Sequence, residues 1–251
     1  MDNKDILGIR PIGETVKSTI DKTIDCVSVF LKAVCLPASE EFGLMFQDKV
    51  RTWRLTNIIK VLEKAEGKLI FHDDKLQLRA NPKVALSIID NASLIDDEEL
   101  QTWWAGLFAS SCTEDGKDDQ NLIFVNLLKD LTSFEVKLLG YCCINCQKYF
   151  YPDKFIVPYG DFRLSIDEIT RITGVSDMSR MDREIDHMIS IGLFSTGIIE
   201  ASGFNIDKGQ IYARLTPSAL ALNLFYKANA AVNTPPDVFW GDTLSLYPIK
   251  N

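Results

Sequence analysis

The chain has 251 residues, a length that suits one large domain or two small ones. Hydrophobic residues make up 46% and charged residues 25%, which is the balance of a globular protein and excludes a disordered chain. The 27 Lys and Arg residues are outnumbered by 35 Asp and Glu residues, so the net charge is −8. Because phosphate contacts require clustered cations, this balance argues against a general nucleic-acid-binding protein.

The first residues predict neither export nor membrane insertion. Residues 1–10 lack the basic stretch and apolar core of a signal peptide. No uncharged run reaches the roughly 20 residues that a membrane-spanning helix needs. We therefore expect a cytoplasmic protein whose six Cys residues remain reduced.

Two long helices are predicted at the start of the chain. Residues 12–35 repeat an apolar side chain every three or four positions, which indicates an amphipathic helix ended by Pro37. Its polar face mixes acids and bases, whereas helices that lie on membranes are rich in Lys and Arg. Packing against the domain is therefore favoured over membrane or partner contact. Ser39 is then predicted to cap a helix over residues 40–66.

The second helix carries a candidate interaction surface near its middle, formed by Lys49, Arg51, Trp53 and Arg54. One interpretation is a solvated face whose cations pair with acidic side chains of the same helix. The other is a small basic patch that binds a phosphate group or an acidic partner.

Capping signals divide the middle of the chain into further helices. Each starts at a residue whose side chain accepts a backbone N–H, and Thr132 with Glu135 forms a capping box. The predicted elements are a small hairpin turning at Asp73–Asp74, a helix from Pro82 to about Asn91, a helix begun by Asp96 or Asp97, a helix over 121–131, a helix from Thr132 to Tyr149 or Phe150, and a linker through Gly160.

Three cysteines form a CCxxC cluster at Cys142, Cys143 and Cys146. A zinc site requires about four ligands, but no second CxxC follows and the two histidines, His72 and His187, stand alone. We therefore favour small buried apolar side chains over metal or redox chemistry.

The last third of the chain changes character. Its predicted elements are a helix with a second capping box at Ser165 and Glu168, a tight turn, a helix from Asp177 closed by Gly192, a strand over 193–201, a polar loop, a strand over 210–215 and a helix capped by Thr216–Pro217. This is the order of a winged helix-turn-helix.

The predicted fold class is therefore mainly α. A helical domain over residues 1–150 precedes a winged helix-turn-helix-like domain with a small β-hairpin over 151–234. Residues 235–251 form a C-terminal tail.

Arg180 and Arg183 are the candidate contact residues of the would-be recognition helix. Residues 151–251 hold 9 Lys and Arg residues against 12 Asp and Glu residues, and carboxylates on a recognition helix repel a duplex. The carboxylates of this helix are Asp177, Asp182, Glu184 and Asp186. Protein contact is thus favoured over DNA binding.

No catalytic constellation emerges from the sequence. The chain contains no HExxH motif, no G-x-S-x-G elbow and no P-loop for nucleotide phosphates. The prediction is a protein without enzymatic activity, resident metal or cofactor.

Four segments resemble a known family. The acidic cap followed by Leu100, Trp104–Ala105 and Leu107 is the most specific of them. The segments are Gly43–Asn57, Pro82–Ser110, Phe124–Leu139 and Leu215–Pro217 with the helix after them. Together they are similar, over about residues 40–226, to the Abi-alpha (abortive infection alpha) family of bacterial proteins. The resemblance implies a mostly helical protein with a role in anti-phage defence.

The expected function is that of a non-enzymatic interaction component of this defence. It would act on a protein partner or form a homo-oligomer through the N-terminal helix and the surface around Trp53. One alternative is a DNA-binding regulator that uses the winged helix. The other is an effector that meets the membrane surface through residues 12–36.

Overall fold

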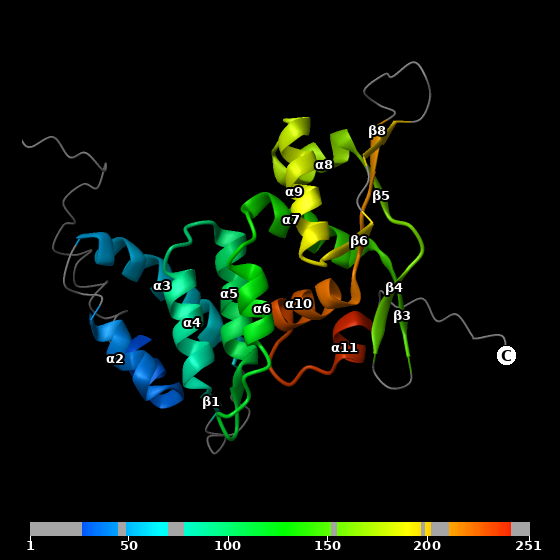
Figure 1. The fold of residues 1–251 in the computed structure, drawn as a ribbon. Coiled ribbons are helices and arrows are strands. Elements are labelled where there is room, and N and C mark those ends of the chain that lie inside the picture. The colour runs from blue at the N-terminus through cyan, green and yellow to red at the C-terminus, as the bar shows by residue number, and fades with distance from the viewer. Residues whose placement is uncertain are drawn as a thin grey trace, which may run out of the picture.

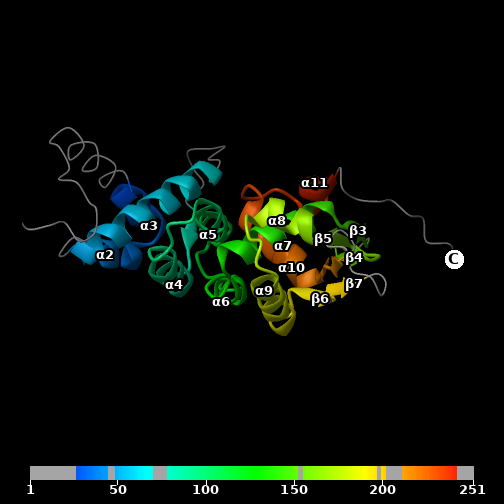
Figure 2. The same ribbon diagram turned by 90° about the horizontal axis from the view of Figure 1, so that it is seen from above.

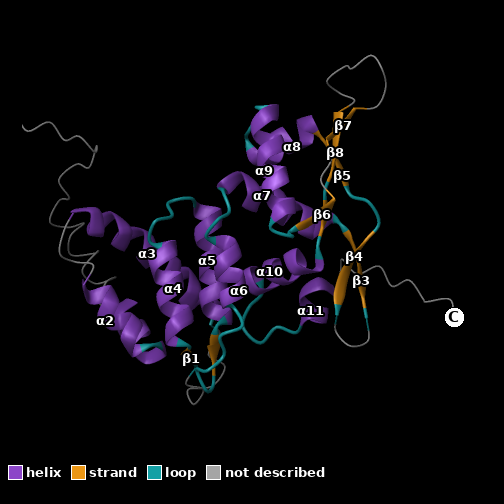
Figure 3. Ribbon diagram, viewed as in Figure 1, coloured by secondary structure: helices purple, strands orange, loops and turns teal. Residues whose placement is uncertain are grey.

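The computed structural model describes residues 27–44, 49–69, 78–151, 155–196, 199–201 and 211–241. This part of the chain is mainly helical, as predicted, with short antiparallel strands (Figure 3). The helices are α2 (Leu36–Leu44), α3 (Lys49–Lys68), α4 (Pro82–Ala92), α5 (Glu98–Ser110), α6 (Leu122–Leu128), α7 (Ser133–Asn145), α8 (Ile166–Thr173), α9 (Met178–Ser190), α10 (Ala219–Asn229) and α11 (Pro236–Trp240).

The strands are β1 (Arg79–Ala80), β2 (Cys112–Thr113), β3 (Gln147–Phe150), β4 (Ile156–Tyr159), β5 (Arg163–Ser165), β6 (Phe194–Thr196), β7 (Ile199–Ala201), β8 (Ile211–Arg214) and β9 (Thr216–Pro217). Apart from β1 and β2, they gather at the end of the molecule opposite α2 (Figure 3).

Helix α5 lies at the centre of the helical part. It contacts α3 and α4 on one side and α10 on the other (Figures 1 and 2). Every residue from Trp103 to Ala109 is buried. A helix that is apolar on all sides must be surrounded by other elements, and α5 satisfies this requirement as the common packing partner of its neighbours.

The predicted caps of α4, α5, α7 and α8 are confirmed. Asp97 begins α5, and its Oδ1 accepts the backbone N–H groups of Glu99 and Leu100 at 3.1 and 3.0 Å. The side chain of Asn81 caps α4 in the same way, and both capping boxes close as expected, at the starts of α7 and α8. Local sequence signals therefore set where these helices begin.

The predicted boundary between the first two helices is wrong. The helical stretch at residues 27–34 ends at Cys35, and α2 begins at once with Pro37 in its second position. Proline is tolerated there because the first backbone N–H groups of a helix have no intrahelical acceptor. Ser39 is consequently buried inside α2 instead of capping a helix. The single helix expected over 40–66 is divided between α2 and α3.

The helix that starts at Thr132 is shorter than predicted. It ends at Asn145, and β3 then pairs with β4, so the predicted linker contains a strand. Lys148 Nζ donates to the carbonyls of Ile144 and Cys146, both at 2.9 Å. This side chain satisfies carbonyls that the end of α7 leaves without intrahelical donors.

Two further predictions concern the hairpin at Asp73–Asp74 and the cap of the last predicted helix. The turn at Asp73–Asp74 lies outside the described residues, and β1 pairs with β2. The predicted cap at Thr216–Pro217 is wrong, because these residues form β9 and pair with β6. Ser218 instead caps α10 by accepting the backbone N–H of Ala221 at 3.1 Å.

The last third contains a three-stranded antiparallel sheet in the order β5-β8-β7. Helices α8 and α9 lie between β5 and β7 in sequence, and Gly174 ends α8 in the left-handed conformation at φ 77°. The start of the predicted C-terminal tail is helical: it forms α11, which buries Trp240.

Helix α10 packs on α5, and α7 contacts α8 and α9, so contacts cross the predicted domain boundary at residue 150. The division into domains stays a prediction.

Candidate interaction surfaces

Arg54 joins α3 to the end of α4. Its Nη2 donates to Asp90 Oδ1 at 2.6 Å, and its Nε donates to Ser93 Oγ at 2.9 Å. One turn along α3, Asn57 Nδ2 donates to the carbonyl of Ser93 at 3.1 Å. Acids of the same helix were expected as its partners, but the described acid that Arg54 contacts is Asp90, and Asp48 lies outside the described residues. An acid of α4 holds it in place.

Trp53 lies beside this anchored arginine. Its side chain is 40% exposed, and Leu94, which follows Ser93, is 53% exposed. The tethered Arg–Asp pair is therefore flanked in sequence by exposed apolar side chains, Trp53 before Arg54 and Leu94 after Ser93. Lys49 and Arg51 belong to α3, but their side chains lie outside the described part of the structure. We call Trp53, Arg54 and Leu94 the Trp53 surface.

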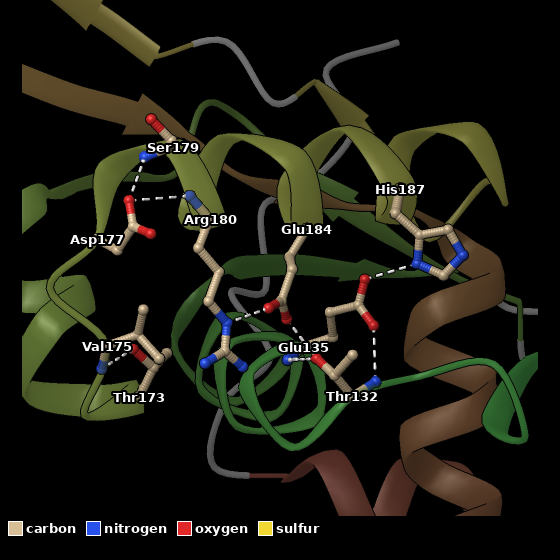
Figure 4. Close-up of polar contacts among 9 residues, drawn as sticks. All are labelled: Thr132, Glu135, Thr173, Val175, Asp177, Ser179, Arg180, Glu184 and His187. Carbon is tan, nitrogen blue, oxygen red and sulfur yellow. Dashed lines mark hydrogen bonds and ion pairs between the residues drawn. The ribbon is translucent and has the colours of Figure 1, made fainter.

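The two arginines predicted on the recognition helix differ in their surroundings. Arg180 Nε donates to Glu184 Oε1 at 2.5 Å, one turn along α9 (Figure 4). Arg183 is exposed and forms no ion pair with the residues that the structure describes. Asp177 serves as the N-cap of α9, accepting the backbone N–H groups of Ser179 and Arg180. Arg183 is thus the more open of the two cations.

Helix α9 is joined to α7 by a buried acid (Figure 4). The Glu135 side chain is 1% exposed, and its Oε2 accepts the backbone N–H of Thr132 at 2.7 Å. Its Oε1 lies 2.6 Å from Nδ1 of His187, which is half-buried on α9. The Thr132 hydroxyl donates to Glu184 in turn. We call Thr132, Glu135, Glu184 and His187 the α7–α9 clamp.

A carboxylate on an imidazole nitrogen also orients the general base of many hydrolases. Such a base requires a hydroxyl or water whose proton it can take. The Thr132 hydroxyl donates to Glu184, and the Ser190 hydroxyl donates to the carbonyl of His187 at 2.7 Å. Both hydroxyls therefore donate to acceptors other than the imidazole, and the Glu135–His187 contact joins α9 to α7.

Sequence reasoning missed this pair, because Glu135 and His187 are 52 positions apart. One signal pointed to it. The capping box fixes only one carboxylate oxygen of Glu135, so the other needs a partner when the helix start is buried.

The cysteine cluster is buried. Cys142 and Cys143 lie inside α7, and burial raises the pKa of both thiols well above the usual value. Thiols held protonated are poor nucleophiles and poor metal ligands. Among the residues that the structure describes, no group of three or more His, Cys, Asp or Glu side chains could hold a metal ion. His72 lies outside them.

The apolar stripe expected to face a membrane or partner is described from residue 27 onward, and residues 12–26 lie outside the description. Its described members Val27, Leu31 and Val34 are buried, and the ring of Phe30 lies 6.0 Å from that of Phe108 on α5. This part of the stripe belongs to the core. No helix in the described ranges is both long and apolar enough to cross a membrane.

Comparison with protein families gives one match. The family model described as abortive infection alpha matches residues 54–219, about two thirds of the chain. The match begins at Arg54 and runs through the α7–α9 clamp to the start of α10. The comparisons with curated proteins and with solved structures found no match.

Proposed function

The chain belongs to the abortive infection alpha family, and from this premise we propose that it acts in anti-phage defence as a protein-interaction component without chemistry of its own. The proposed contact site is the Trp53 surface. Its occupant is a protein partner or a second copy of the chain. The proposed location is the cytoplasm.

The exposure of Trp53 on a fixed helix is the observation that carries this proposal. Trp and Arg are the side chains most enriched at the energetic centres of protein interfaces. Arg54 is already held by Asp90 and Ser93, so the helix next to Trp53 is ordered before any partner arrives. An ordered surface loses less conformational entropy on binding, which favours affinity.

Replacing Trp53 with Ser tests the proposal. Bacteria carrying the wild-type or Trp53→Ser protein are challenged with a phage against which the wild type protects. We expect the variant to lose protection and to melt within about 2 °C of the wild type, because surface substitutions change stability little. Ile123→Ser is the matched control, since Ile123 on α6 is 61% exposed and lies outside the Trp53 surface.

Equal protection by Trp53→Ser and wild type would rule this surface out. Sedimentation distinguishes the two kinds of occupant. If the wild type forms an oligomer that Trp53→Ser dissociates, the occupant is a second copy. If both proteins sediment as monomers and protection is still lost, the occupant is another protein.

We further interpret residues 163–214 as a winged helix. The element order β5, α8, α9, β6, β7, β8 and the sheet order β5-β8-β7 support this interpretation, with β6 paired separately with β9. Residues 202–210, the expected wing, lie outside the described ranges. Helix α9 would be the recognition helix. Its cation Arg180 is engaged by Glu184, which supports protein contact over DNA contact.

DNA binding is the second candidate, and the topology alone favours it. A mobility-shift assay at low salt tests it with the wild type and Arg183→Glu. A shift that the variant abolishes would replace protein contact with DNA contact as the role of α9. The absence of a shift at micromolar protein would exclude DNA binding.

Flotation with liposomes tests the membrane alternative. A protein that stays in the soluble fraction would count against membrane contact.

A further inference from the structure

A cavity of about 260 Å³ lies where the loop after α5 meets the loop after α10. Both segments contribute polar side chains to its wall. The members used below are Ser110, Thr113, Asp118, Tyr226, Lys227 and Asn233. Small-molecule sites usually measure roughly 300–1,000 Å³, so this cavity suits a compact ligand.

Lys227 is the charged donor of this wall. Burial lowers the pKa of its ammonium group, and the nearby Asp118 carboxylate opposes that shift. Within the described residues, Lys227 makes no hydrogen bond or ion pair at contact distance. Lys68, another lysine that burial affects, donates to the carbonyl of Asn229 at 3.2 Å. Lys227 is partly exposed, and a partly desolvated cation without such an acceptor gains more from an anion than a fully hydrated one does.

The hydroxyl groups of the wall are already engaged. Tyr226 donates to the carbonyl of Thr234 at 2.5 Å, and Thr113 donates to Asp115 Oδ1 at 3.0 Å. Ser110 Oγ accepts from Asn121 Nδ2 at 2.9 Å. These contacts fix the shape of the cavity and leave Lys227 as its group in need of an acceptor.

The backbone of the wall is held in an uncommon conformation. Asn233 has φ 65°, in the left-handed region that residues other than Gly seldom adopt. Asn tolerates this conformation better than other residues with a Cβ, which suits it to the loop that borders the cavity.

We propose that this cavity binds a small carboxylic acid that also carries a hydrogen-bond donor, such as an amino acid or a hydroxy acid. The carboxylate meets Lys227, and the donor meets Asp118. The Asp118 Oδ1 and Oδ2 atoms already accept the backbone N–H and the side-chain amide of Gln120, and each oxygen has a second lone pair for the ligand. A cation beside an acid is complementary to a ligand that carries a carboxylate at one end and a hydrogen-bond donor at the other, whereas a phosphate dianion has no donor for Asp118 and is repelled by it. The inference is independent of the proposed function.

Thermal unfolding of the full chain tests it. Each common amino acid, lactate and inorganic phosphate is added at millimolar concentration, because a ligand that binds only the folded state raises the Tm. We expect at least one amino or hydroxy acid to raise the Tm by several degrees and phosphate to have no effect. Titration calorimetry with that acid then gives its affinity.

Lys227→Met is the test variant, and Lys129→Met is its control. Lys129 is exposed at the end of α6 and is not part of the cavity wall, and its Nζ donates to Asn126 Oδ1. Lys227→Met should lose the ligand-dependent shift, and its unliganded Tm should not fall, since a desolvated charge has been removed. Lys129→Met should keep the shift.

Three results would overturn the inference: no acid shifts the wild type, the shift persists in Lys227→Met, or phosphate alone shifts the Tm. If Lys227→Met fails to fold, Asp118→Asn serves in its place, and it should weaken binding at least tenfold. Trp53→Ser should bind the acid as the wild type does, which separates this test from that of the proposed function.

Discussion

Two helix pairs in this protein are held together by opposite means. Where α5 meets α10, Gly106 lies so close to Ala228 that a Cβ on Gly106 would be 1.6 Å from the Ala228 carbonyl oxygen. Where α7 meets α9, a buried acid, an imidazole and a hydroxyl form directional contacts. The first contact depends on close packing, so one added methyl group would disrupt the whole contact. The second consists of separate bonds that can be removed one at a time.

The largest expected effect comes from breaking the α5–α10 contact. Gly106→Ala places a methyl group inside the Ala228 carbonyl, and backbone cannot move aside as a flexible side chain would. We expect a loss of more than about 3 kcal/mol in unfolding free energy, beyond the usual range for overpacked cores. Urea unfolding followed by circular dichroism measures it.

Gly67→Ala is the matched control for that experiment. Gly67 lies in α3, and a Cβ there meets nothing within 4 Å. Alanine should therefore stabilise the helix by up to about 1 kcal/mol, through its smaller loss of backbone freedom. Equal effects of the two substitutions would contradict the close approach of α5 and α10.

Trp240→Ala extends the comparison to α11. The indole is buried, with its ring 5.7 Å from Phe225 and 4.9 Å from Lys148 Nζ. Truncation should cost about 3 kcal/mol, because a large buried ring leaves a cavity. Thermal unfolding measures the loss. Val238→Ala, at an exposed position of the same helix, should be nearly neutral.

His187→Ala tests the polar contact. The substitution removes one partner of the buried Glu135 carboxylate, which keeps the backbone N–H of Thr132. We expect a cost of about 1–3 kcal/mol, less than for Gly106→Ala, because one bond is lost and the apolar packing stays. Urea unfolding gives the cost, and hydrogen exchange should show faster opening of α9.

Arg183→Ala provides the comparison on the same helix. This side chain is exposed, so its removal should change stability by less than about 0.5 kcal/mol. A similar loss in both variants would mean that the whole of α9 is sensitive, and the α7–α9 clamp would have no special role.

The same contrast explains what sequence reasoning could predict. Helix starts at Asn81, Asp97, Thr132 and Ser165 were predictable, because a cap is a contact between residues two or three positions apart. The family resemblance could also be recognised from the sequence, because the caps and core residues of Pro82–Ser110 form one continuous segment.

Contacts between residues far apart in the chain could not be predicted from the sequence. The acid that holds Arg54 is 36 positions away, and Lys148 ends α7 from within the next strand. Pro37 could be read as ending one helix, yet it stands near the start of another, since the two roles look alike in one sequence. The cavity around Lys227 joins loops that lie more than 100 positions apart.

The smallest effect sharpens the comparison by pH. The Ser165 backbone N–H and hydroxyl hold the pKa of Glu168 below its usual value of 4.5. A lowered folded-state pKa means that the ionised carboxylate stabilises the protein at neutral pH, and that this contribution is lost as the pH falls through the folded-state pKa. Glu168→Gln should therefore cost about 0.5 kcal/mol at pH 7 and almost nothing in acid. Asp167→Asn, in the same turn, removes an equal charge without the capping bonds. Urea unfolding from pH 7 into acid measures the cost of Glu168→Gln. A cost that stays the same at every pH would contradict the prediction, because it would mean that the shape of the side chain, and not its charge, makes the cap.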